Sequence, residues 1–409
     1  MTNNMKNRTT TREPLSETGP KLPLNGWTLA LAGAGLLSFG AAVQAEEAAH
    51  QVLTALSQTT LSGYVDTSAI WKFGTGNAPF PGRAFDGASK MDGFNLNVVK
   101  LQLEKPLDEG QWSAGYQVGL LFGPDAVAYN ASPVGGAFDT DDVSVKDAYV
   151  ALRAPVGNGI DFKVGTFATV LGYEVFEGPN NPNYSRSYGW QLEATQHTGV
   201  LATYKAADWL SLAGGVANTH NAGINARPMR GGVAASETEK TYLGGITITA
   251  PESFGALSGA TLYAAIVDGL MGNTVDTTSY YVGATIPTPL EGLAVGAAYD
   301  YRDDALIAGP ANNRAYALAG YVSYQATEKL KLNGRADYTN ADDGTWFAST
   351  KAGKHNELFS VTGTLDYSLW ENVLSRAELR WDHGMNGARP FGVSDKNAIT
   401  LAANIVYKF

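Results

Sequence analysis

The chain has 409 residues, a formal net charge of -10 at pH 7 and no cysteine. The absence of cysteine excludes disulfides, thiolate nucleophiles and cysteine-ligated metal sites. The five histidines never recur four residues apart, so the two-histidine metal motif of helices is absent. An acidic chain without a basic stripe is also a poor partner for nucleic acid.

The N-terminus has the composition of a secretory signal peptide. Residues 1–26 are polar and net basic, residues 27–43 are apolar, and Ala45 ends a small-residue cleavage site. We therefore expect a signal peptide over residues 1–45, cleavage after Ala45, and a short periplasmic segment over residues 46–60. The alternative, a membrane anchor, would need a longer and more evenly apolar segment.

From Thr60 onward, segments that alternate apolar and polar residues are separated by turn signals, a pattern typical of β-strands. No apolar run in this region approaches the roughly 18 residues that a membrane helix requires. Sixteen such segments are predicted, at 61–72, 94–105, 111–122, 143–154, 159–168, 197–206, 208–219, 239–250, 259–269, 277–287, 291–302, 314–325, 329–340, 356–368, 372–383 and 397–409.

The links between these segments alternate in length. Links after even-numbered segments are short, as in APVGNG and TPLEG, whereas links after odd-numbered segments are usually longer and polar, as in 73–93, 169–196 and 384–396. Membrane barrels show this alternation, with tight periplasmic turns and longer outer loops. An even strand count leaves both chain ends in the periplasm.

Alternation within the strands fits lipid outside and water inside. The segment 329–340 places Lys331, Arg335 and Asp337 on one face, and Leu332 and Tyr338 on the other. A charge facing the bilayer midplane costs about 2–4 kcal/mol, so the charged face should line an aqueous lumen. Because only closure satisfies every backbone group in lipid, we predict an all-β, transmembrane, antiparallel up-and-down barrel of about 16 strands over residues 61–409.

The last residue carries a specific signal. Phe409 follows Tyr407 and Ile405 at two-residue steps. This ending resembles the C-terminal signature of outer-membrane barrels, and the resemblance implies recognition by the barrel-assembly machinery.

The longest link, 169–196, is the third outer loop of the predicted barrel. It resembles in position the third loop of general porins, which folds into the lumen and narrows it. The resemblance implies a constriction built from Tyr173, Glu174, Glu177, Asn181, Asn183, Tyr184, Arg186 and Tyr188. The alternative is an external loop that only covers the mouth.

Further charges are predicted on the lumenal faces of segments 329–340 and 372–383. These pore-wall residues are Lys331, Arg335, Asp337, Arg376, Glu378 and Arg380. Fixed charges along a water-filled pore bias which ions enter, and a basic ladder would favour anions. The alternative is a structural set of salt bridges, with Asp382 included, that cancels much of the bias.

Three stretches carry a family resemblance. TTLSGYVDTSAIW, KVGTFATVLGYEVFEGPNNPNYSRSY and HTGV resemble the β-barrel porin type 2 family. The resemblance implies a porin-like barrel and identifies no solute. Sixteen-stranded porins are usually trimeric, so a homotrimer is expected by analogy.

The sequence therefore predicts an outer-membrane porin through which small hydrophilic solutes and ions diffuse passively, because sixteen strands leave an aqueous channel. Its expected surroundings are outer-membrane lipid and lipopolysaccharide, and no cofactor, metal or catalytic residue is predicted. An outer-membrane enzyme is the main alternative, with His197, His220, His355 and His383 as candidates, although a G-x-S-x-G elbow is absent. Two further alternatives are a calcium site at Asp139, Asp141 and Asp142 and an adhesin without an open pore.

Overall fold

The computed structural model describes residues 58–74, 80–87, 90–129, 143–221, 224–230, 233–234, 239–271, 275–306, 312–347, 355–392 and 394–409. The predicted signal peptide and the three aspartates of the calcium alternative lie outside these ranges, as does most of the predicted segment 46–60. In the described ranges, no helix is both long and apolar enough to cross a membrane.

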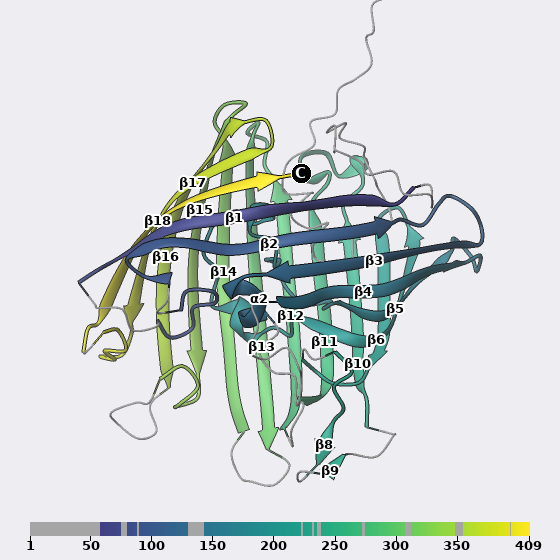
Figure 1. Ribbon diagram of the computed structural model, residues 1–409, viewed down its shortest axis with the longest axis horizontal. Helices are drawn as coiled ribbons and strands as arrows, with labels where there is room; N and C mark the ends of the chain where they lie inside the picture. Colours follow the sequence, from purple (N-terminus) through teal and green to yellow (C-terminus); the bar gives the residue numbers. More distant parts are fainter. Residues whose placement is uncertain are drawn as a thin grey trace, which may run out of the picture.

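Sixteen antiparallel strands close into one barrel (Figure 1). Each strand pairs with its neighbours in the chain, and the first strand pairs with the last. The strands are β1 Thr60–Phe73, β2 Gly93–Lys105, β3 Ser113–Phe122, β4 Val143–Ala154, β5 Ile160–Ala168, β6 Gln196–Ala207, β7 Leu210–Ala217, β10 Thr241–Thr249, β11 Thr261–Met271, β12 Val275–Pro287, β13 Leu293–Leu306, β14 Asn312–Gln325, β15 Leu330–Ala341, β16 Asn356–Trp370, β17 Val373–Gly384 and β18 Asn397–Lys408.

The predicted barrel and its strand number are confirmed, and most predicted strand ends lie within a few residues of the observed ones. The sequence pattern missed a small two-stranded ribbon, β8 (Met229–Arg230) and β9 (Val233–Ala234), in the link after β7. Strands of two residues are too short to show a period of two, so alternation cannot reveal them.

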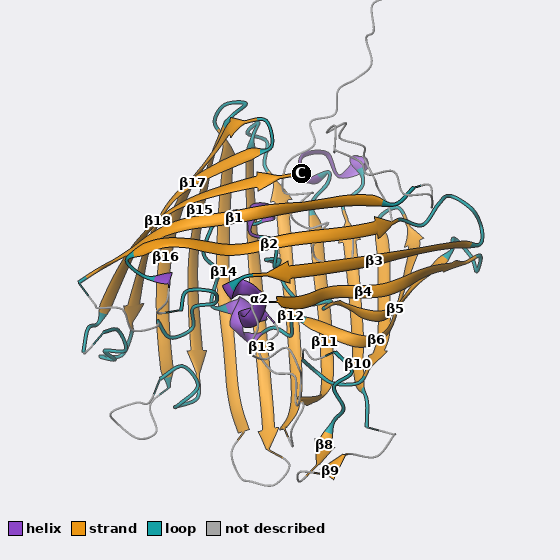
Figure 2. Cartoon of the chain, viewed as in Figure 1, coloured by secondary structure: helices purple, strands orange, loops and turns teal. Residues whose placement is uncertain are grey.

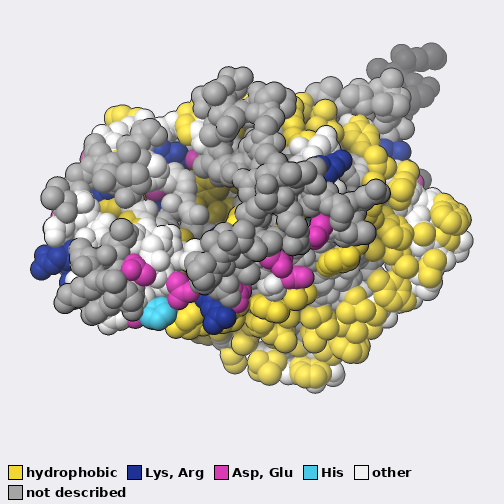
Figure 3. Space-filling model, turned by 90° about the horizontal axis from the view of Figure 1, so that it is seen from below, with side chains coloured by type: hydrophobic (Ala, Val, Ile, Leu, Met, Phe, Trp, Pro, Cys, Tyr) yellow, Lys and Arg dark blue, Asp and Glu magenta, His cyan; other side chains and the backbone are white. Residues whose placement is uncertain are grey.

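The two faces of the strands differ as the alternation predicts. In β18, Ile405 and Tyr407 point outward and are 52% and 45% exposed, whereas Thr400 and Asn404 point inward and are buried. The outward side chains form an apolar surface suited to hydrocarbon (Figure 3). The same view shows acidic side chains in a row near the rim.

The inner wall has two chemically distinct parts. Strands β6 and β10–β14 contribute a mainly apolar part, which includes Leu201, Leu243, Tyr263, Tyr281 and Tyr321. Strands β15–β17 contribute Arg, Asp and Glu side chains that are also buried. A wall of a wide barrel is buried only if something lies against it, so these two parts indicate where segments of the chain fill the lumen.

Short helical segments lie among the loops (Figure 2). They are α2 (Pro124–Tyr129), which lies against β2, β3 and β4, and the 3-10 turns η2 (Gly178–Asn180), η3 (Gly189–Leu192) and η4 (Glu252–Leu257). Segments η2 and η3 both belong to the link between β5 and β6. This link is the predicted third loop, and its contacts define the candidate site.

Candidate channel constriction

The loop 169–196 begins on the apolar part of the wall. The ring of Tyr173 stacks on Tyr321 of β14 with their centroids 4.2 Å apart, and its hydroxyl accepts a hydrogen bond from Thr285 of β12 at 3.2 Å. A Cβ atom at Gly296 of β13 would lie only 2.0 Å from the Tyr173 hydroxyl. The glycine on the strand therefore makes the space into which the loop tyrosine fits.

Glu174 joins the loop to β15. Its carboxylate forms a salt bridge of 2.8 Å with Arg335 and accepts a hydrogen bond of 2.7 Å from the backbone N–H of Ser187. Arg335 also donates to the carbonyl oxygens of Ser185 and Arg186, at 2.6 and 3.1 Å. One buried guanidinium thus holds Glu174, Ser185 and Arg186 of the loop against β15.

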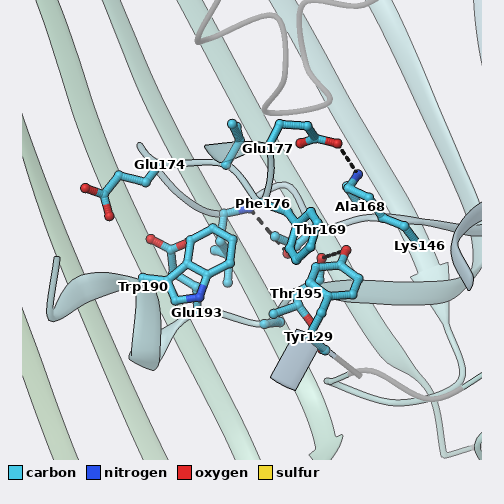
Figure 4. A pocket seen from close by; sticks show the side chains of 13 residues that line it. Tyr129, Lys146, Ala168, Thr169, Glu174, Phe176, Glu177, Trp190, Glu193 and Thr195 are labelled. Atoms are coloured by element: carbon cyan, nitrogen blue, oxygen red, sulfur yellow. Dashed lines mark hydrogen bonds and ion pairs between the residues drawn. The ribbon is translucent and has the colours of Figure 1, made fainter. Parts of the chain in front are cut away.

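Glu177 joins the loop to the opposite part of the wall. Its carboxylate contacts Lys100 of β2 and lies 3.2 Å from Lys146 of β4 (Figure 4). Burial alone would raise the pKa of Glu177, but the two lysines lower it well below its usual range. A bulge opposite Gly119 and Leu120 makes room for Lys146, which also pairs with Asp147 at 2.9 Å.

The asparagines shape the tip of the loop. Asn181 accepts from the backbone N–H of Val175 at 2.8 Å and donates to the carbonyl of the same residue at 2.6 Å. Asn183 donates to Thr364 of β16 at 2.7 Å. The first residue folds the tip back on itself, and the second attaches it to the wall.

Tyr184, Arg186 and Tyr188 complete the predicted loop residues. The hydroxyl of Tyr184 donates to Ser68 of β1 at 3.0 Å, and that of Tyr188 donates to Asp382 of β17 at 2.7 Å. Arg186 donates to the carbonyl oxygens of Phe176 and Tyr184 at 2.7 and 3.0 Å. All eight predicted loop residues therefore make contacts inside the barrel or within the loop itself.

Most of the predicted pore-wall charges bind this loop. Arg376 donates to the carbonyls of Gly178 and Asn181, both at 2.7 Å, and Arg380 donates to that of Arg186 at 2.6 Å. Glu378 accepts the backbone N–H of Tyr184 and Ser185 at 2.6 and 3.0 Å, and Asp337 accepts that of Tyr188 at 3.0 Å. Lys331 is the exception among these charges. It lies near the start of β15, is half-buried, and stands opposite Asp366 in register.

The wall charges are also paired with one another. Arg376 lies 2.9 Å from Asp366, and Arg380 lies 2.9 Å from Asp382. These geometries match the structural set of salt bridges that was the alternative to an anion-selective ladder. The loop and wall together form a polar network whose charges are largely neutralised in place.

The sequence model of one protein family matches residues 58–409, and its description is "Putative beta-barrel porin-2, OmpL-like". The chain belongs to this family. No curated protein sequence matches the chain.

Several solved structures are similar to this porin-2 chain. They include the anion-selective porin of Comamonas acidovorans (10% identity, TM-score 0.58, covering 86% of this chain and 99% of that one). They also include the outer-membrane channel DcaP of Acinetobacter baumannii (13%, 0.56, 88% and 100%) and OmpT of Vibrio cholerae (14%, 0.54, 88% and 100%). At these identities the likeness shows the fold alone.

Two other loops of this porin-2 chain reach the site, and sequence reasoning missed both. Arg83, in the link between β1 and β2, forms a salt bridge of 2.7 Å with Asp382. Phe85 from the same link and Tyr129 of α2 pack on Phe176 of the third loop, with ring centroids 5.7 and 4.6 Å apart. Aromatic residues inside otherwise polar links are the signal that could have revealed this packing.

The third loop also borders a pocket (Figure 4). Its lining combines aromatic and ionisable side chains, which are Tyr129, Phe176, Trp190, Lys146, Glu174, Glu177 and Glu193. Within the described part of the chain, no group of three or more His, Asp or Glu residues is arranged to hold a metal ion.

The four candidate histidines occupy different places. His197 is buried and contacts Thr169 at 2.9 Å, while His220 is buried and contacts Ser279 at 3.1 Å. His383 contacts Asn397 at 2.7 Å, and His355 lies 3.5 Å from Asp342. The structure does not bring the four histidines together into one site.

Proposed function

We propose that this protein is an outer-membrane porin that lets small hydrophilic solutes and ions diffuse passively through its lumen, with the loop 169–196 as the constriction. The observation that carries the proposal is the attachment of this loop to the inner faces of β15–β17 by both charged groups and backbone hydrogen bonds. A loop fixed at this position narrows a sixteen-stranded barrel without an extra plug domain.

Membership of the porin-2 family supports this function. So does the fold shared with proteins described as an anion-selective porin and an outer-membrane channel. An outer-membrane setting also explains the predicted export signal and the apolar barrel exterior, which would contact lipid and lipopolysaccharide. A related OmpT structure is described as a trimer, which supports a homotrimer for this chain.

The charge arrangement leads us to propose weak ion preference. Arg335, Arg376 and Arg380 are buried and each has a carboxylate partner, so they contribute little net field to permeating ions. We propose that these arginines position the loop rather than select anions.

A channel fits the histidine geometry better than an enzyme does. The Nε2 atom of His220 lies 3.1 Å from the hydroxyl of Ser279, as in a base and its serine nucleophile, but both residues are buried. The other ring nitrogen of His220, Nδ1, has no hydrogen-bond partner within the described residues. Nucleophilic catalysis uses a third group there to orient the imidazole.

Liposome swelling tests the proposal with solutes of increasing size. Folded protein in liposomes should admit an amino acid and a monosaccharide, and the swelling rate should fall steeply toward a trisaccharide. The matched control is the same protein after heat unfolding, which should give no swelling. Folded protein that admits none of these solutes would contradict the proposed function.

A further inference from the structure

The two sides of the third loop meet the barrel wall differently. On one side, Arg335, Arg376 and Arg380 attach residues 174–188 to β15–β17, as described above. On the other side, two pockets lie between the loop and the first strands of the barrel. Because the arginine side is occupied by bonded segments, the width of the constriction is determined on the side of the pockets.

The two pockets are lined by the loop together with different parts of the wall. The first, which we call the β4 pocket, is the one drawn in Figure 4, and its lining includes Tyr129 of α2 and Lys146 of β4. The second, which we call the β1 pocket, is lined by Asp66 of β1, Asn97 of β2 and Phe85 of the link between β1 and β2. Both pockets therefore separate the loop from the wall opposite β15–β17.

Phe176 of the third loop borders both pockets. Its ring packs edge to face on Tyr129, with the centroids 4.6 Å apart, and on Phe85, with the centroids 5.7 Å apart. Tyr129 belongs to α2, which lies against β2, β3 and β4, and Phe85 belongs to the link above β1 and β2. The ring thus reaches from the loop to the segments that cover the opposite wall.

Neighbouring contacts fix the position of this ring. The Arg186 guanidinium lies 5.5 Å from the Phe85 ring and 5.4 Å from the Trp190 ring, and it donates to the carbonyl oxygen of Phe176 at 2.7 Å. Glu177, the next residue, holds the loop to the wall through Lys146. Since the contact of Glu177 is ionic and does not involve the Phe176 ring, replacing the ring leaves this attachment in place.

The rest of both linings is largely polar, so the ring is an apolar barrier between hydrophilic spaces. Polar side chains of the β1 pocket are Asp66, Asp86, Asn97, Asp125, Tyr184, Ser185 and Arg186. Those of the β4 pocket include Lys146, Thr169, Glu177, Glu193 and Thr195. A hydrophobic constriction hinders the passage of hydrated ions and polar solutes.

We propose that Phe176 sets the size limit of the constriction, as an aromatic partition between the β1 pocket and the β4 pocket. A smaller side chain at this position joins the two pockets into one polar opening. The inference rests on the proposed function, because it names the residue that limits which hydrophilic solutes pass the same lumen.

A series of side-chain sizes at position 176 tests the partition by liposome swelling. The swelling rate for a trisaccharide should be highest for Phe176→Ala, lower for Phe176→Leu and wild type, and lowest for Phe176→Trp. A residue that only packs the loop gives a different order, because a cavity and an overfilled site both loosen the packing. A rise in both Phe176→Ala and Phe176→Trp, or no change in Phe176→Ala, would overturn the partition.

Phe391→Ala is the matched control for loss of a buried aromatic ring. Phe391 lies in the loop before β18, packs edge to face on Phe80 with the centroids 5.4 Å apart, and borders neither pocket. Its replacement should leave the size limit at the wild-type value. All variants are compared as folded barrels on a heat-shift gel. An equal gain in trisaccharide swelling for Phe391→Ala and Phe176→Ala would show that loosened packing suffices, and would overturn the partition.

Thiol labelling gives a readout that does not depend on transport. The chain has no cysteine, so Thr195→Cys places one thiol at a half-buried position of the β4 pocket. A maleimide with a bulky polar group should label this thiol severalfold faster when Phe176→Ala is added. Equal labelling rates would overturn the partition, whatever the swelling. If labelling accelerates but no folded variant admits a solute, the proposed porin function fails and the partition stands.

Discussion

Arg335 and Arg380 show what an inward-facing charge does in this barrel. Both side chains are buried, and both donate to carbonyl oxygens of the third loop. A buried charge that loses its partner costs about 3–5 kcal/mol, so these contacts fix the loop strongly. Alternation in the sequence placed the two arginines on the correct face. It could not reveal their partners, because Glu174 lies 161 positions away from Arg335.

Arg380→Met should loosen the loop. The substitution leaves Asp382 and Asp337 with fewer cationic neighbours and removes the hydrogen bond to the Arg186 carbonyl. We expect a noisier and larger single-channel current, with the barrel still folded on a heat-shift gel. Arg227→Met, at an exposed site in another loop, is the matched control. Unchanged current in the Arg380 variant would contradict a positioning role for this arginine.

At the scale of elements, the strands were predictable and the loops were not. A strand with one face toward lipid and the other toward the lumen alternates apolar and polar residues, as β15 and β18 do, so a short stretch of sequence is enough to recognise it. The third loop was identified from its length and position. Its docking depends on contacts between segments far apart in the chain, such as Glu177 with Lys100 and Tyr188 with Asp382, and local patterns do not encode these pairs.

Replacing residues 174–188 with a short Gly-Ser linker should widen the channel. The deletion removes the segment that Arg335, Arg376 and Arg380 hold against the wall. Single-channel conductance should increase severalfold, and liposomes should admit larger sugars. Deleting the β8–β9 ribbon, in the loop after β7, is the control and should leave both readouts near wild type. Equal conductance in the two deletions would contradict the assignment of 174–188 as the constriction.

At the scale of the whole molecule, closure of the barrel depends on its two ends. The backbone of Phe409 exchanges hydrogen bonds of 2.9 and 3.0 Å with Gly63 of β1. A Cβ atom at Gly63 would lie 2.8 Å from the Phe409 ring, so the glycine accommodates the terminal aromatic residue. The predicted faces of Ile405 and Tyr407 agree with their outward positions. Recognition of this ending by the assembly machinery remains a prediction.

Phe409→Ala should lower the amount of assembled barrel in the outer membrane of cells. Phe409→Tyr keeps an aromatic ring at the end of the chain and should assemble at nearly the wild-type level. The measurement is the heat-shifted fraction in isolated outer membranes. Refolding of both variants in detergent separates a folding defect from a recognition defect. Equal assembly of the alanine and tyrosine variants in cells would contradict the proposed signal.

The most direct test of the channel is single-channel conductance of refolded wild-type protein in a planar bilayer, with the reversal potential measured under a salt gradient. A porin with a docked third loop and paired wall charges should give stable steps and a reversal potential near zero. Strong anion preference would contradict the neutralised wall. No steps, from protein whose heat-shift gel shows a folded barrel, would contradict the channel itself.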